Sequence, residues 1–161
     1  MLPLFLGLTL VNLLSLLIVG VLGYLATHGH NVRPWHTLAG ALATLICCGV
    51  HCIVFTYFIA TAKWVQHAVT VKHLDPTLAN PTRSFRRQAF PAALFAIAIV
   101  FATAILGAAR DNAMIPRGPH RLLAIVALVA NIAVATIEYC AIARNGRLID
   151  SVLARINAAT S

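Results

Sequence analysis

The feature that most constrains this chain is its long opening stretch without charge. Residues 1–31 contain no Asp, Glu, Lys or Arg, and residues 2–25 are predominantly apolar. A helix of about 24 residues is long enough to cross a hydrocarbon core of about 30 Å. A secretory signal would have a basic start, a shorter apolar core and a small-residue cleavage site, and none is evident. The stretch predicts a retained membrane-spanning helix over residues 2–26.

Three further apolar stretches predict three more spans, over residues 35–62, 89–109 and 120–143. Pro34 suits the first turn of the second helix, whose helical character continues to about Val71, so its last turns should stand out of the bilayer. The chain is 60% hydrophobic and 10% charged, whereas a soluble domain is about 25% charged. The sequence therefore predicts an all-α integral membrane protein, a four-helix transmembrane bundle forming one domain over residues 1–161.

Turn signals separate these spans and mark the start of the tail. Asp75-Pro76 and Asn80-Pro81 are typical of turns and helix starts, and a third helix that began near Thr82 would be kinked at Pro91. Asn145-Gly146 is typical of a helix end. Apolar residues at helical spacing after it predict a separate short amphipathic helix in the tail, residues 144–161. We find no sequence repeat between the two halves.

The net charge of +8 would suggest nucleic acid as a partner in a soluble protein. Here the basic residues lie mostly between the apolar stretches, where they meet lipid headgroups and set topology, so we expect a lipid bilayer and no nucleic acid as partner. One side of the predicted bundle has twice as many Lys and Arg as the other. The excess predicts a multi-pass protein of the cell membrane with both termini in the cytoplasm.

A polar group stands inside the second span. Cys48, His51 and Cys52 lie three and four residues apart, on one helical face, and Gly40 and Thr44 continue that line. Small and polar residues on one stripe face neighbouring helices in a membrane, so His51 should face the bundle interior. Four interpretations remain open: a haem ligand at His51, a metal site of His51, Cys48 and Cys52, an uncharged imidazole hydrogen-bonded to a neighbour, or a group that handles protons or binds a substrate.

Glu138 is the acidic residue of the fourth span, and Asn131 precedes it by two helical turns on the same face. Its predicted depth matches that of His51, so we expect a hydrogen bond between the two side chains across the second and fourth helices. The alternative places Glu138 close enough to the membrane interface to pair with Arg144 or Lys63.

His36 and His120 lie at matching depths near the outer ends of the second and fourth spans. A b-type haem takes two histidines from facing helices, and these two meet the depth requirement. His51 has no histidine partner at its own level. The candidate cofactor ligands are therefore His51, His36 and His120.

These residues predict a small membrane bundle with a buried histidine site that binds haem b and transfers electrons within the membrane. The alternative is a non-catalytic subunit that assembles with itself or with a larger membrane complex, because the third span has small residues such as Ala98 and Ala102 at packing intervals. No motif identifies a reaction or a catalytic residue. The lack of internal repeats argues against a transporter.

Overall fold

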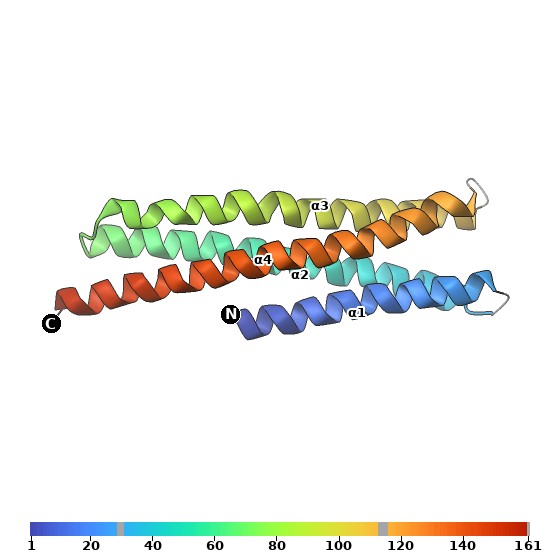
Figure 1. Ribbon diagram of the computed structural model, residues 1–161, viewed down its shortest axis with the longest axis horizontal. Coiled ribbons are helices and arrows are strands. Elements are labelled where there is room, and N and C mark those ends of the chain that lie inside the picture. The colour runs from blue at the N-terminus through green and yellow to red at the C-terminus, as the bar shows by residue number, and fades with distance from the viewer. Residues whose placement is uncertain (29–30, 113–115, 161) are drawn as a thin grey trace.

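The computed structural model describes residues 1–28, 31–112 and 116–160 and consists of four long helices side by side (Figure 1). They are α1 (Leu2–Thr27), α2 (Arg33–Val71), α3 (Asn80–Asp111) and α4 (Arg117–Thr160), with a single 3₁₀ turn, η1 (Pro76–Ala79), before α3. All four are long and apolar enough to cross a membrane. Within the described residues there are no strands. The predicted all-α transmembrane four-helix bundle is confirmed.

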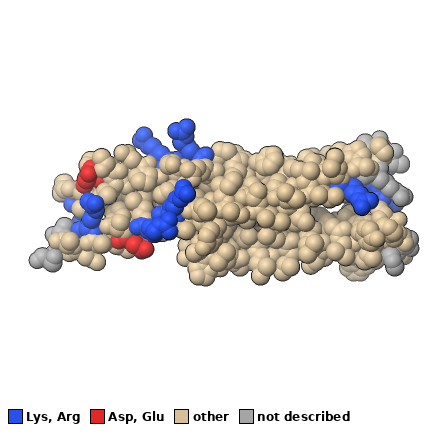
Figure 2. Space-filling view, viewed as in Figure 1, with Lys and Arg blue, Asp and Glu red and all other residues tan. Residues whose placement is uncertain are grey.

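The outer surface of the bundle is what a lipid environment requires. Figure 2 shows Lys and Arg side chains gathered toward the two ends, with a stretch free of charged side chains between them on this face. Large apolar side chains along the helices are turned outward, among them Leu45, Ile105 and Val129. Apolar patches of this extent are rare on soluble monomers, whereas lipid tails cover them at no cost.

The helices extend further at one end than sequence alone indicated. We call the end with the α1–α2 and α3–α4 connections the histidine end and the opposite end the C-terminal end. α2 continues to Val71 as predicted, while α3 begins at Asn80 and passes through Pro91 without a break. A small core joins these extensions, made of Val65, Ala68, Val69 and Val152 with Leu74 and Leu78 packed against it.

The predicted break at Asn145-Gly146 is wrong, because α4 is one helix of 44 residues that runs through both positions. Asn145 is buried, and its amide donates a hydrogen bond of 2.9 Å to the hydroxyl of Thr61 on α2. The side chain therefore ties two helices together where its residue type suggested a helix end. No separate tail helix exists in the described part of the chain.

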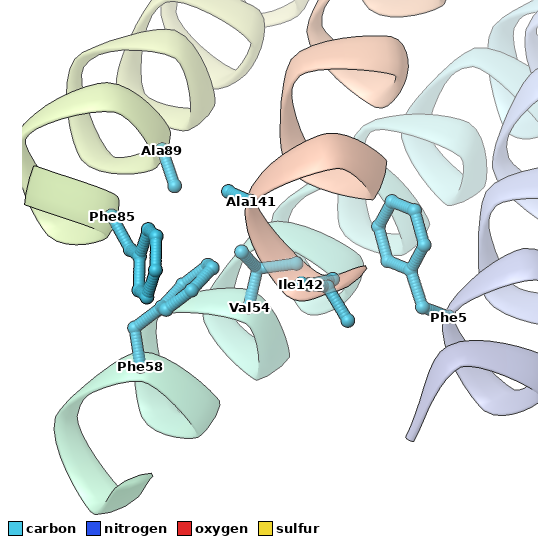
Figure 3. Packing of buried hydrophobic residues seen from close by; sticks show 7 residues of the cluster. All are labelled: Phe5, Val54, Phe58, Phe85, Ala89, Ala141 and Ile142. Atoms are coloured by element: carbon cyan, nitrogen blue, oxygen red, sulfur yellow. The ribbon is translucent and has the colours of Figure 1, made fainter. Parts of the chain in front are cut away.

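The largest buried cluster holds all four helices together near the middle of the molecule (Figure 3). It is made of Phe5, Val54, Phe58, Phe85, Ala89, Ala141 and Ile142. Alanines on α3 and α4 let those helices approach closely, and the phenylalanine rings of α1, α2 and α3 fill the space beside them.

The two halves of the chain are structural repeats, which corrects the expectation that no repeat exists. The α1–α2 hairpin matches the α3–α4 hairpin when each residue is paired with the one 84 positions later, which is the sequence separation of two contacts between α2 and α4. Three such equivalent pairs meet one another along the bundle: His36 with His120, Cys47 with Asn131, and Thr61 with Asn145. Because α1 and α3 run in the same direction, the pseudo-two-fold axis lies parallel to the helices.

Candidate functional site

His36 and His120 face each other across the pseudo-two-fold axis at the histidine end. Their ring centroids are 6.1 Å apart and the rings are inclined by 73°. Both side chains are half-buried. The structure thus brings together the two histidines that depth alone had paired in the sequence.

Each ring is held by the same hydrogen bond in its own hairpin. Nδ1 of His36 lies 3.1 Å from the carbonyl oxygen of Val19, and Nδ1 of His120 lies 3.1 Å from that of Thr103. A carbonyl only accepts, so each Nδ1 carries the proton that it donates. In the neutral imidazole, Nε2 then keeps its lone pair for a ligand. A partner on the second nitrogen is the usual support of a metal-binding histidine.

A glycine makes room for each ring. A Cβ built on Gly23 would lie 2.9 Å from Cε1 of His36, and one built on Gly107 would lie 3.0 Å from Cε1 of His120. Any larger residue at either place would push the imidazole away from its neighbouring helix. Both glycines therefore belong to the site, although each lies in a different helix from its histidine.

The sequence contains a signal for this site that our sequence reasoning missed. Leu22-Gly23 and Leu106-Gly107 each precede a histidine by the same interval, and Arg33 and Arg117 each stand three residues before it. These matching residues are separated by apolar residues that differ between the two halves, so the repeat is hard to recognise from the sequence alone. Aligning the halves at an offset of 84 residues would have found them.

An ion pair joins the two hairpins above the histidines. Nη2 of Arg33 on α2 lies 2.9 Å from Oδ1 of Asp111 at the end of α3, and the hydroxyl of Thr37 donates to Oδ2 of the same carboxylate at 3.3 Å. Arg110 is 3.8 Å from it. The histidine end therefore has more basic groups than one carboxylate neutralises.

The second candidate group lies deeper in the bundle. Nδ1 of His51 is 2.8 Å from Oε1 of Glu138, so the predicted hydrogen bond between α2 and α4 is confirmed. The exposed fractions of the two residues are 2% and 1%. His51 faces the interior, as its helical stripe indicated, and Glu138 pairs with it rather than with Arg144 or Lys63. Nε2 of His51 is buried and has no hydrogen-bond partner among the residues that the structure describes.

A layer of amides lies one to two helical turns further toward the histidine end. Asn12 of α1 donates to Asn131 Oδ1 at 3.1 Å, and the thiol of Cys47 lies 3.5 Å from the same oxygen. Asn131 in turn donates to the carbonyl of Ala127 at 2.9 Å. Three helices are thereby joined by polar contacts, and sequence reasoning had identified only Asn131 among them.

The three residues proposed as a metal site are not brought together. His51 is buried, Cys48 is half-buried and Cys52 is exposed on the outside of α2. A step of four residues along a helix rotates by about 400°, so Cys52 lies about 40° around the helix from Cys48. The boundary between the buried and the exposed face of α2 falls between these two cysteines. Among the described residues no three His, Cys, Asp or Glu side chains form a group that could hold a metal ion.

Comparisons with known proteins give no relative from which a function could be taken. No family model matches the chain, and no curated protein or solved structure matches it either.

Proposed function

We propose that the protein binds one haem b between His36 and His120 and transfers electrons within the membrane. The observation that carries the proposal is the facing of two imidazoles from symmetry-related helices, each with its Nδ1 tied to a backbone carbonyl. The haem would supply the redox chemistry. The bundle would orient it and tune its potential through burial and through these hydrogen bonds.

Haem suits this site better than a bare metal ion because only two protein ligands face each other here. A first-row metal needs four or more ligands. A porphyrin supplies four nitrogens itself and requires only the two axial ones. His36 and His120, whose ring centroids are 6.1 Å apart, would be these two ligands.

The charges at the histidine end also favour haem. Haem b carries two propionate groups, which need cations or water. Arg33 stands three residues before His36, and Arg121 directly follows His120. Arg110 lies 3.8 Å from Asp111, the carboxylate that pairs with Arg33. Figure 2 shows a basic patch at this end on the face that it draws. These arginines are suited to holding the propionates at the membrane surface.

His51 is the weaker candidate for the axial ligand. Its Nε2 is enclosed by protein atoms, so iron and a macrocycle would have to displace packed side chains. No second histidine stands opposite it among the described residues. We therefore assign the haem to His36 and His120 and leave His51 to a different role.

Absorption spectra of the purified protein test the proposal. Expression with ample haem should give a Soret band and the sharp visible bands of a six-coordinate, low-spin haem after reduction. His36→Ala and His120→Ala should each abolish that low-spin spectrum, and the double variant should bind no haem. His67→Ala, in the exposed part of α2, is the matched control and should keep it. Wild-type protein without a Soret band, or an unchanged spectrum in both ligand variants, would overturn the assignment.

We also infer the orientation of the bundle from its basic residues. The C-terminal end carries Lys63, Lys72, Arg83, Arg86, Arg87, Arg144, Arg147 and Arg155, against four arginines at the other end. Short connections rich in Lys and Arg stay in the cytoplasm. The haem would then lie near the outer face of a cell membrane, with both termini in the cytoplasm.

The second candidate function, a subunit that assembles with itself or with a larger complex, rests on α3. Ala104 and Ala108 are both exposed, one helical turn apart, and paired small residues allow another helix to approach closely. Replacing both with leucine should break such an assembly in native gels while leaving the spectrum unchanged. An unaltered assembly would remove this candidate.

A further inference from the structure

We propose that His51 and Glu138 form a proton-binding site in the core of the bundle, separate from the haem site and not dependent on it. The pair takes up one proton from water, which forms the N–H or O–H bond of the hydrogen bond between Nδ1 and Oε1, and releases it to water again. The first support is geometric. The two atoms are 2.8 Å apart and both side chains are almost completely buried.

The pair is electrically isolated. α1 has no charged residue, α2 has none between Arg33 and Lys63, and α3 has none between Arg87 and Arg110. Glu138 is the one acidic or basic residue of α4 between Arg121 and Arg144. A carboxylate in this core can therefore be balanced only by the imidazole opposite it or by a proton.

Other titratable side chains near the pair are neutral ones. α2 contributes the thiols of Cys47 and Cys48 and the phenol of Tyr57, of which only Cys47 is fully buried. Cys140 and Tyr139 of α4 are exposed. The segments of α1 and α3 packed at this level contribute Asn12, Phe5 and alanines. None of these side chains supplies a positive charge. Met1, which carries an amino group, is exposed and lines a surface hollow with Cys52 and Tyr57, outside the buried core.

Charge counting then defines two states. With one proton bound, the pair is neutral, either as a carboxylic acid with imidazole or as a carboxylate with imidazolium. Without it, a single negative charge remains in the apolar core, which is costly. Nε2 of His51 has no partner, so the imidazole is not fixed by a second hydrogen bond and can change its tautomer as the proton comes and goes.

The internal repeat shows that packing does not require this pair. The residue equivalent to His51 in the second half is Ala135, and the residue equivalent to Glu138 in the first half is Val54. Val54 is buried in the main apolar cluster. The same place in the bundle is thus filled by apolar side chains on one side of the axis and by an acid and an imidazole on the other. Packing at this level therefore does not by itself call for an acid and an imidazole.

The pair lies nearer to one end of the bundle. Along α4, Glu138 is six residues from Arg144 and 17 from Arg121, which are about 9 Å and 26 Å of helix. We therefore place proton exchange at the C-terminal end. This is the end opposite to the two histidines proposed to bind haem.

The chain offers a selective probe, because Glu138 is its single glutamate. Protein labelled with ¹³C at the glutamate carboxyl gives one side-chain signal in NMR and infrared spectra, free of overlap with the three aspartates. In wild-type protein in detergent micelles, this signal should change in a single one-proton step when the pair takes up or releases its proton. Transfer to D₂O should shift it, which shows that the proton exchanges.

Variants of the partner identify the pair as the titrating unit. His51→Ala should change the response of this signal to pH, because the carboxylate loses the group that balances it. His51→Gln keeps an amide for the hydrogen bond and serves if the alanine variant does not fold. The variant with His51→Ala and Glu138→Val copies the apolar half of the repeat and should fold with an unchanged helical content and no carboxyl signal.

Two results would overturn the proposal. One is a glutamate signal that stays constant over the whole pH range and does not change in D₂O. The other is a transition whose midpoint is the same in wild type and in the folded His51 variant, since proton binding would then not involve the imidazole.

Discussion

Gly23 and His36 are packed so closely that a methyl group on the glycine would lie 2.9 Å from Cε1 of the ring, and Gly107 stands in the same relation to His120 at 3.0 Å. This contact is made twice by residues far apart in sequence. Its repetition indicates that the position of the imidazole matters in both hairpins. It also yields the most direct prediction for the proposed haem site.

Gly23→Ala and Gly107→Ala should each weaken haem binding. Overpacking a fitted contact costs about 1–3 kcal/mol, which corresponds to roughly a tenfold to a hundredfold loss of affinity. Titration of haem into the apoprotein, followed at the Soret band, measures the change. Gly49→Ala and Gly146→Ala are matched helical controls, because a Cβ there meets nothing within 4 Å. Equal effects in all four variants would contradict the prediction.

The buried pair should show strong coupling in a double-mutant cycle. His51→Ala alone leaves Glu138 buried without its partner and should destabilise the protein by about 3–5 kcal/mol. Adding Glu138→Val should recover most of that loss, since the equivalent site on the other side of the axis is already apolar. Unfolding in mixed micelles followed by circular dichroism provides the free energies. Additive losses in the double variant would show that the two side chains do not act together.

The amide layer should be sensitive at Asn131. Asn131→Ala removes the acceptor of the bonds from Asn12 and Cys47, so a buried donor is left unpaired at a cost of about 1–3 kcal/mol. Asn112→Ala is the control, because its side chain bonds to the carbonyl of Ala108 at an exposed position. The same unfolding assay compares them. A loss no greater than that of the control would mean that water replaces the missing acceptor.

Asn145 should stabilise the C-terminal end locally. Its 2.9 Å bond to Thr61 joins α4 to α2, and such bonds in membrane proteins average about 0.6 kcal/mol. Asn145→Ala should therefore change global stability by less than about 1 kcal/mol and accelerate amide exchange beyond residue 145. Thr136→Val, whose hydroxyl bonds to its own helix, should leave exchange there unaltered. Faster exchange along the whole of α4 would argue against a local role.

Much of this architecture follows from composition and hydropathy alone. Four apolar stretches of spanning length can be buried only in lipid, and a helix is the one open structure that satisfies its own backbone there. The inward direction of His51 and its bond to Glu138 also followed from local rules, because side chains three and four residues apart share a helical face and matching depths bring them level. Those predictions needed no knowledge of the neighbouring helices beyond their number.

Other features depended on which helices pack together and at what rotation. Asn145 looked like a helix end, yet Thr61 on α2 provides it with a partner and α4 continues. Cys52 shares a stripe with Cys48, but the packing edge of α2 leaves it exposed. The repeat stayed hidden because lipid-facing positions accept almost any apolar residue and so retain little similarity. Only the pairing of the two hairpins about their common axis placed His36 against His120, since that contact joins residues 84 positions apart and no local rule specifies it.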